Sequence, residues 1–341
     1  MRSVQQGRLV ASRERPQPPC GTLIRSYNAG EGDTLPMAEP EQVPDIVYHY
    51  TSIDTMMKIV ASESIWATSV CYLNDTSEQS HFLNLVRSRI PHIKFATSEE
   101  REAAESFLNV QEGGFANRPF IASFSAEADS LPQWRSYCNA GNGVAIGFSS
   151  NCLRRAAIKT DKSTPPFTRF DRVRYPDASN GYPEIDAEII EQLETVKMTI
   201  EVMKITDAVT ASSLTLSELF RFMLLEHACF RKSASFRSEN EYRLVVDTII
   251  PRYDLLRYRT TRSCMIPYLD LKIPHYEEGH DKDPDFQLSN PSMGGFYRFI
   301  KRVVVGPTPH KDLTLETVRA FFWSNLILVD VVPSNVSFRD W

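Results

Sequence analysis

The stretch that decides the fold is residues 120–148, FIASFSAEADSLPQWRSYCNAGNGVAIGF. Its first six residues are apolar or small and follow Pro119, which is typical of a strand. Leu131–Cys138 is a short helical segment, and Asn139–Gly143 is rich in turn residues. Val144–Phe148 is an apolar run that indicates a buried strand. Short strands interleaved with helices, without the regular βαβ order of a doubly wound sheet, predict an α+β fold.

The same interleaving continues on both sides of this stretch. Upstream, Ile46–Tyr50 is β-rich, and Ser52 is suited to cap a following helix. Downstream, residues 183–230 change to a helical period, which predicts a helical hairpin inserted between strands. The remaining expected elements are strands at 65–68, 171–175, 241–246, 265–269, 300–305 and 326–332 and helices from Thr76 through Val86 and at 313–323.

The ends and loops set the expected domain boundaries. Residues 1–44 hold six prolines and little periodicity, so we expect a disordered leader, with Met37 as an alternative start. Residues 45–341 are expected to form one domain that includes the helical insert. The polar residues 276–294 are expected to form a mobile loop within it.

The composition is that of a globular protein. The 341 residues are 42 % hydrophobic and 24 % charged, with 38 Lys and Arg against 43 Asp and Glu, a net charge of −5. This balance excludes a strongly basic nucleic-acid coat and leaves a local basic groove open. No run of about 18 apolar residues occurs and the N-terminus lacks an apolar signal core, so we expect neither membrane insertion nor secretion.

The spacing of the cysteines and the absence of standard motifs limit the kinds of functional site that we expect. The six cysteines include no pair with CxxC spacing, so we expect reduced thiols, no zinc ribbon and a cytoplasmic location. The phosphate-binding patterns GxxxxGK[ST] and GxGxxG and the metal motif HExxH are absent. Acidic residues and histidines at 275–283 match no recurring ligand spacing, so we expect a solvated loop and no metal.

Three patches carry reactive side chains at expected strand ends. The first is Tyr48-His49-Tyr50-Thr51. A histidine at this place can hydrogen-bond a ribose hydroxyl with Thr51 beside it, or it can be a half-buried sheet residue between two packing tyrosines.

The second patch combines Ser123-Phe124-Ser125 with Gln133–Tyr137. Alternation places both serine hydroxyls on one face of the strand. Trp134 and Tyr137 are three residues apart and share a helix face. This surface either stacks on a flat ring or forms part of the core.

The third patch is Glu239-Asn240-Glu241-Tyr242-Arg243. A period of two puts Glu239, Glu241 and Arg243 on one side of the strand and Tyr242 on the other. Charged groups on one buried face must be paired, and the alternative is a solvated edge strand. Lys232 and Phe236, just upstream, are expected to be loop and packing residues.

In this order the patches resemble the bacterial domain-of-unknown-function family DUF2971. The resemblance covers roughly residues 46–310 and rests on five motifs. These are Y-H-Y-T at 48–51, L-N-D-x-x-E at 73–78, F-S with W-x-x-Y and G-x-x-I-G-F between 124 and 148, K-x-x-x-F-x-x-E-x-E-Y-R at 232–243 and V-x-x-G-P at 303–307.

A weaker resemblance concerns ADP-ribosyltransferases. His49-Tyr50-Thr51 is similar to the His-x-Thr opening motif of the diphtheria-toxin and poly-ADP-ribose-polymerase type, and Glu239-Asn240-Glu241 to the E-x-E motif of the arginine-modifying branch. Both motifs imply a mixed, split β-sheet around bound NAD. Tyr50 stands where glycine usually follows the histidine, and the helical insert is large.

The resemblance also implies roles for individual residues. Glu241 would stabilise the oxocarbenium-like ribose and Glu239 would orient the acceptor. His49 and Thr51 would hold the adenosine ribose, with Ser125 in the same cofactor site. Nicotinamide would stack on Tyr50, Tyr72 or Trp134, and Arg135 or Arg243 would face the pyrophosphate. Asn74 and Asp75 would shape the acceptor loop or form only a turn.

Three functions follow as alternatives. The favoured one is NAD-dependent ADP-ribosyl transfer to a protein or nucleic acid, as in a toxin or phage-defence effector. The second is a non-catalytic module that senses a nucleotide or binds a partner in the same cleft. The third is a metal-dependent nuclease, because Glu241-Tyr242-Arg243 faintly resembles an E-x-K strand with Asp75 or Glu239 as second carboxylate.

Overall fold

The structure is a computed structural model, and its compact unit runs from Val43 to Trp341. It describes residues 43–73, 78–109, 118–138, 142–154, 167–176, 182, 184–205, 215–247, 253–261, 263–272 and 299–337. Asn74, Asp75, the loop 276–294 and nearly all of the expected leader therefore lie outside the described residues. Within the described part, no helix is both long and apolar enough to cross a membrane.

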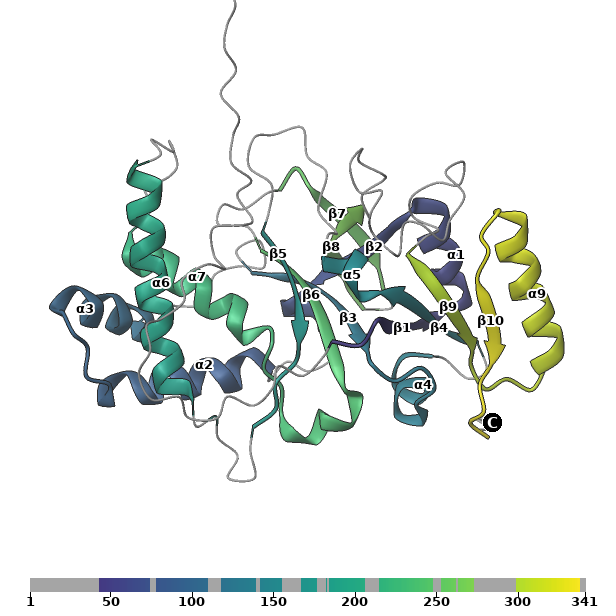
Figure 1. Cartoon of the computed structure of the whole chain (residues 1–341), viewed down its shortest axis with the longest axis horizontal. Helices are drawn as coiled ribbons and strands as arrows, with labels where there is room; N and C mark the ends of the chain where they lie inside the picture. Colours follow the sequence, from purple (N-terminus) through teal and green to yellow (C-terminus); the bar gives the residue numbers. More distant parts are fainter. Residues whose placement is uncertain are drawn as a thin grey trace, which may run out of the picture. The chain divides into compact units, whose positions relative to one another are not determined.

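Ten strands of the described residues form one mixed sheet (Figure 1). The main path is β10-β9-β4-β1-β3-β2-β8-β7, and β6 pairs with β3 and with β5. Only the β9–β10 pair is parallel among these strands. The strands are β1 (Ile46–Ser52), β2 (Ser64–Ser69), β3 (Phe120–Ser125), β4 (Gly143–Ser149), β5 (Phe167–Arg172), β6 (Glu241–Asp247), β7 (Leu256–Thr260), β8 (Met265–Lys272), β9 (Ile300–Val305) and β10 (Asp330–Pro333).

Helices lie on both faces and at both ends of the sheet (Figure 1). Alternate residues of β3 and β6, among them Phe124 and Leu244, enter the largest core, to which α1 and α9 also contribute. The other face of β1 packs Tyr48 and Tyr50 against Trp134 of α4. The helices are α1 (Ile53–Ser62), α2 (Glu78–Arg89), α3 (Ser98–Ser106), α4 (Leu131–Tyr137), α5 (Ser150–Arg154), α6 (Ile185–Ile205), α7 (Leu216–Ala228) and α9 (Lys311–Ser324).

Two sequence motifs meet where α4 packs on the sheet. Gly306 follows β9, and its N–H donates to the Gly143 carbonyl (2.9 Å). A Cβ at Gly306 would lie 2.9 Å from Cε3 of Trp134 and 3.0 Å from the Gly143 oxygen. Only glycine leaves room for the indole there, which explains why a Gly-Pro strand end accompanies a Trp helix in this chain.

The helices of the insert pack against other helices of the chain. Helices α6 and α7 fall within residues 183–230, and α7 begins with a capping box in which Thr215 and Glu218 satisfy each other's backbone N–H groups. They share a second core with α2 and α3, including Phe82, Ile189 and Phe220. The two later helices thus complete a four-helix cluster that the sequence periodicity showed only in part (Figure 1).

The α+β prediction is confirmed, and several element boundaries differ from the expected ones. The expected strand at 171–175 is β5, four residues earlier, and the expected strand at 326–332 begins only at Asp330. Leu326 has a positive φ of 59°, which a strand does not accommodate, because the chain turns there after α9. The polar helix α3 and the exposed strand β7 have weak hydrophobic patterns and were not expected.

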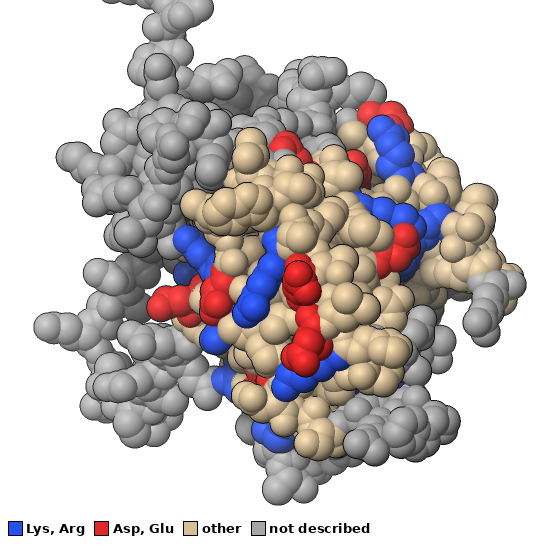
Figure 2. Space-filling view, turned by 90° about the vertical axis from the view of Figure 1, so that its right-hand side faces the viewer, with Lys and Arg blue, Asp and Glu red and all other residues tan. Residues whose placement is uncertain are grey.

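The surface around α9 and β10 carries charges of both signs. Figure 2 shows acidic and basic side chains interspersed on this face of the described residues. Arg302 and Asp330, for example, form an ion pair with 3.2 Å between Nε and Oδ2. No broad single-sign patch is visible among the described residues on this face, in line with the net charge of −5.

Candidate functional site

The sheet forks at β3. On one side, all six residues of β3 pair with β6. On the other side, β2 pairs only with Phe120 and Ile121, and β1 only with Ser125. Strands β1 and β2 therefore diverge along β3, and the sheet opens at this point.

A cleft of about 680 Å³ lies at this fork. Its lining includes residues from β1, β2, β3, β6 and β7 and from helix α1. The ionisable residues other than tyrosine that line it are His49, Lys232, Glu241, Arg243 and Arg259, and its aromatic residues are Tyr50, Trp66, Tyr72, Tyr137 and Phe236. The volume is in the usual range for a small-molecule site.

His49 spans the gap between the diverging strands. Its Nδ1 donates to the backbone oxygen of Ser123 (2.9 Å), since a carbonyl can only accept. Burial lowers the pKa of His49; the bond to Ser123 opposes this effect and the nearby Arg259 adds to it. The neutral ring with its proton on Nδ1 leaves Nε2 as an acceptor, suited to a hydroxyl group of a ligand.

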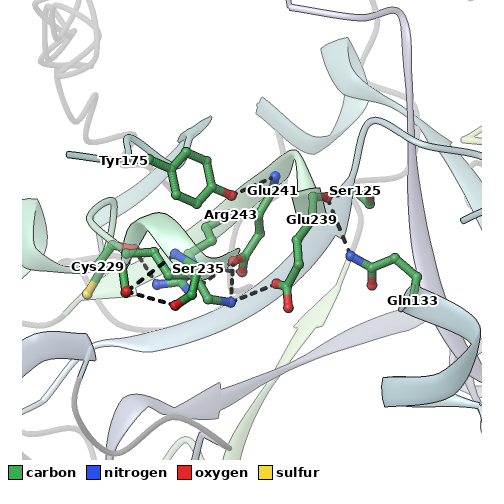
Figure 3. Close-up of polar contacts among 10 residues, drawn as sticks. Ser125, Gln133, Tyr175, Cys229, Ser235, Glu239, Glu241 and Arg243 are labelled. Carbon is green, nitrogen blue, oxygen red and sulfur yellow. Dashed lines mark hydrogen bonds and ion pairs between the residues drawn. The ribbon is translucent and has the colours of Figure 1, made fainter. Parts of the chain in front are cut away.

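Four charged residues, three of them buried and Glu239 partly buried, form a cluster beside the fork (Figure 3). Lys232 Nζ lies 2.7 Å from Glu239 Oε2 and 3.0 Å from Glu241 Oε2. Arg243 donates through Nε to Glu241 Oε1 (2.7 Å) and through Nη2 to Oε2 (3.1 Å), and its Nη1 donates to the Cys229 carbonyl (2.7 Å). The predicted pairing of charges on one face of this strand is thus present, and Tyr242 lies in the core on the other face.

The cluster fixes the ionisation of Glu241. Burial alone would raise the pKa of this carboxyl, but the charges of Arg243 and Lys232 outweigh it and lower the pKa to about 2. Burial raises the pKa of the neighbouring Tyr175 to about 12, and its hydroxyl accepts from the Glu241 N–H at 3.3 Å. Glu241 is therefore a carboxylate at neutral pH, oriented from two sides.

The backbone before β6 is shaped to present Glu239. Residues Ala234–Glu239 form a short 3-10 helix that begins after Ser233 and ends at Asn240, whose φ of 43° is left-handed. Asparagine tolerates this conformation better than most side chains. Ser125 Oγ donates to the Glu239 carbonyl (2.7 Å) and Gln133 Nε2 reaches the same oxygen (3.4 Å), so β3 and α4 hold this corner (Figure 3).

Arg259 of β7 also lines the cleft. Its Nη2 donates to Thr68 Oγ1 of β2 (3.2 Å), and partial burial lowers the pKa of the guanidinium. Among the described residues, no carboxylate pairs with Arg259. A guanidinium remains protonated at neutral pH, so it adds to the cleft a positive charge that no described carboxylate pairs with.

The structure brings together half of the predicted site residues. His49, Tyr50, Thr51, Tyr72, Glu241 and Arg243 line the one cleft, and Glu239 joins it through Lys232. Tyr50 is constrained, because its Oη donates to the Glu127 carbonyl (2.7 Å) and accepts from the Ser130 N–H (3.0 Å). Its ring packs edge-on against Trp134, with 4.6 Å between centroids.

The other predicted site residues do not line the cleft or lie outside the described residues. Trp134 is buried and donates through Nε1 to Asp129 (2.7 Å), so it is a core residue and not a stacking surface. Tyr137, its neighbour on α4, lines the cleft instead. Ser125 braces the Glu239 corner, and Arg135 is exposed and does not line the cleft. Asn74 and Asp75 lie outside the described residues.

Sequence reasoning missed Lys232 and Arg259. Lys232 was expected to be a loop residue, yet its ammonium group joins both acidic residues of the cluster. Its place at the start of the K-x-x-x-F motif was the available signal. No sequence signal pointed to Arg259, because β7 is short, exposed and distant in sequence from the three patches. No group of three or more metal-ligating side chains occurs among the described residues.

The sequence comparisons agree with one part of this picture. The profile of DUF2971, a family of proteins of unknown function, matches residues 133–244. No curated protein matches, and no solved structure matches. The matched segment runs from α4 to β6 and contains the whole charged cluster, whereas His49 and Arg259 lie outside it. Over this segment the chain is thus similar to DUF2971.

Proposed function

We propose that the fork cleft binds NAD and that the protein transfers ADP-ribose from it to a macromolecular acceptor, a protein or a nucleic acid. The observation that carries the proposal is that His49 and Glu241, from strands separated by β3, line one cleft. Tyr48, Ser125 and Glu241 are successive partners across β1, β3 and β6. At about 4.8 Å per strand, these backbones are about 10 Å apart, a span that one dinucleotide bridges.

The proposed reaction breaks the bond between C1′ of the ribose and the nicotinamide nitrogen. Nicotinamide leaves with the bonding electrons, and the acceptor forms a bond to C1′ and loses a proton. Positive charge develops on the ribose as the bond breaks, and an adjacent carboxylate stabilises it. Glu241 has this role, and Glu239 orients the acceptor and receives its proton.

The ion pairs of Glu241 are compatible with such a role. A carboxylate has about four acceptor positions. Arg243 and Lys232 occupy one on Oε1 and two on Oε2. The remaining position on Oε1 suits a ribose hydroxyl, while the two cations keep the group ionised and immobile.

The same pairing favours a second candidate, a module that binds the nucleotide without turning it over. Two cations beside Glu241 reduce the negative charge that it presents to a forming oxocarbenium ion. Nucleotide binding in the cleft requires no catalytic carboxylate. The two candidates share the site and differ in whether nicotinamide is released.

The nuclease alternative receives less support from the site. A catalytic Mg²⁺ would need carboxylates that converge on it. Here Lys232 and Arg243 already neutralise Glu239 and Glu241 at distances of 2.7 to 3.1 Å. A divalent cation would have to displace both positive side chains.

Calorimetric titration of NAD, with nicotinamide release followed in parallel, tests the proposal. We compare wild type with Glu241→Gln and Glu239→Gln, and use Glu188→Gln of the helical cluster as control, since Glu188 is also a buried, ion-paired carboxylate and does not line the cleft. We expect wild type and control to bind and release. In Glu241→Gln, release falls by roughly 10²- to 10³-fold while binding persists.

Each contrary result has a defined meaning. No binding of NAD by wild type overturns the proposal. Binding by wild type without release establishes the binding module in its place. Equal release by Glu241→Gln removes Glu241 from the reaction. Thermal melting of each variant shows whether a lost signal reflects unfolding.

A further inference from the structure

We propose that Arg259, together with Thr68, binds the phosphates of the nucleotide and gives the cleft its preference for a phosphorylated ligand. This inference rests on the proposed function, because it assigns a part of the same ligand to a part of the same cleft. Arg259 lies on β7, outside the segment that the DUF2971 profile matches and outside the motifs quoted from the sequence.

The first argument is the balance of charge. Lys232 and Arg243 lie within 2.7 to 3.1 Å of the carboxylates of Glu239 and Glu241, so these two pairs are neutral together. Among the described residues, Arg259 is the one cleft-lining cation without a carboxylate partner. In a chain of net charge −5, this local positive charge favours an anionic ligand group at that end of the cleft.

The second argument is the geometry of the guanidinium. A protonated arginine has five N–H donors, and the one to Thr68 Oγ1 is the hydrogen bond that the described residues give it. The bond to Thr68 anchors one nitrogen of the group, and no described residue occupies its other donors, which a ligand can therefore use. A planar guanidinium donates two parallel hydrogen bonds to a phosphate, which lysine cannot do.

The third argument is that the arginines expected to hold the pyrophosphate are used otherwise or lie elsewhere. Arg243 donates its hydrogen bonds to Glu241 and to the Cys229 carbonyl. Arg135 is exposed on α4 and does not line the cleft. Arg259 shares the cleft with His49, the residue assigned to the ribose, and lies close enough to affect its pKa. A ribose and its attached phosphate would thus meet neighbouring side chains.

The test compares two ligands and two variants by calorimetry. The ligands are ADP and adenosine, which share the base and the ribose and differ in the diphosphate. The variants are Arg259→Gln and Arg257→Gln. Arg257 lies on the same strand, is exposed and donates to the Leu256 carbonyl (3.0 Å), but it does not line the cleft.

We expect ADP to bind wild type at least tenfold more tightly than adenosine. In Arg259→Gln, affinity for ADP and for NAD falls roughly 10-fold or more, and affinity for adenosine is unchanged. Arg257→Gln binds all three ligands as wild type does. Because Arg259 is on an exposed strand, its replacement leaves the melting temperature close to that of wild type.

Two results overturn the inference. One is an equal affinity of wild type and Arg259→Gln for ADP; the other is an equal loss in Arg257→Gln, which would indicate a general effect of surface charge. Both are separable from failure of the transferase. If ADP binding depends on Arg259 but wild type releases no nicotinamide, this inference is supported and the transferase proposal is wrong. If Arg259→Gln releases nicotinamide with unchanged NAD affinity, the transferase proposal is supported and this inference is wrong.

Discussion

Two buried ion clusters in this molecule have the same chemistry and different surroundings. In the helical region, Glu188 of α6 accepts from Arg231 at 2.5 and 2.6 Å and lies 2.6 Å from Nδ1 of His227. At the fork, Glu241 is paired with Arg243 and Lys232. In both clusters, burial would raise the pKa of the carboxyl, and the hydrogen bonds and charges of its partners outweigh burial and lower the pKa to about 2.

The difference between them is access. The Arg231 guanidinium lies under the rings of Phe82 and Tyr182, 5.4 and 5.3 Å from their centroids, and no member of this cluster lines the cleft. Lys232, Glu241 and Arg243 border a cavity of about 680 Å³. A displaced pKa therefore does not by itself identify a functional site, and the open space beside the charges is the decisive feature.

The largest effect that we expect is on stability, from the closed cluster. Arg231→Met removes one partner of a buried pair and leaves the Glu188 carboxylate with His227 alone. The free energy of unfolding should fall by about 3 to 5 kcal/mol, measured by urea denaturation. NAD affinity of the folded variant should equal that of wild type. A fall in affinity at a temperature where the variant is folded would contradict the separation of the two clusters.

Acid should weaken both clusters alike. Because Glu188 and Glu241 have folded pKa values of about 2, below the ordinary 4.5, each stabilises the fold above about pH 4.5 and loses this contribution as the pH falls toward 2. Each carboxylate adds about 3 kcal/mol at neutral pH, of which about 2 kcal/mol is lost near pH 3.

This pH dependence is measurable by urea denaturation between pH 7 and pH 3. The loss of unfolding free energy on acidification should be about 2 kcal/mol smaller in Glu188→Gln and in Glu241→Gln than in wild type. A variant whose acid sensitivity matches that of wild type would show that its carboxylate is not held ionised by the cluster.

The two aromatic residues of α4 extend the comparison to uncharged side chains. Trp134→Phe removes a buried indole and its bond to Asp129, so unfolding free energy should fall by about 2 kcal/mol with NAD affinity unchanged. Tyr137→Ala, at the cleft, should instead weaken NAD binding several-fold with little change in stability. Melting curves and calorimetry on both variants separate the cases, and interchanged effects would refute the placement of the cleft.

The smallest expected effect concerns the corner that presents Glu239. Ser125→Ala removes the hydroxyl that donates to the Glu239 carbonyl and accepts from the Glu127 N–H (3.1 Å). We expect a loss of about 1 kcal/mol in unfolding free energy. Nicotinamide release should fall more than NAD affinity, because the corner positions Glu239. A change in affinity alone would indicate that Ser125 contacts the nucleotide.

The sequence predicted the features that depend on local pattern. Alternation placed Glu241 and Arg243 on one face of β6 and Tyr242 on the other, since a strand has a period of two. It also predicted that these charges would be paired, because burial of an unpaired charge is too costly. The α+β class followed from the same local patterns.

The remaining features depend on long-range packing. Whether Trp134 faces a ligand or Tyr50 is decided by Gly306, more than 170 positions away. Arg259 reaches the cleft only because β7 pairs with β8 and β8 with β2, a sheet order that no local pattern contains. Lys232 is a local case by contrast, because its partners Glu239 and Glu241 lie seven and nine residues further along and the turn at Asn240 brings them back to it.

The most direct test of the account is a crystal structure of the protein with NAD, or with ADP where NAD is turned over. The account predicts the nucleotide in the fork cleft, with a ribose hydroxyl at His49 Nε2 and the phosphates on Arg259. A nucleotide bound away from the fork, for example in the groove beside α9 lined by Arg319 and Trp323, would contradict it.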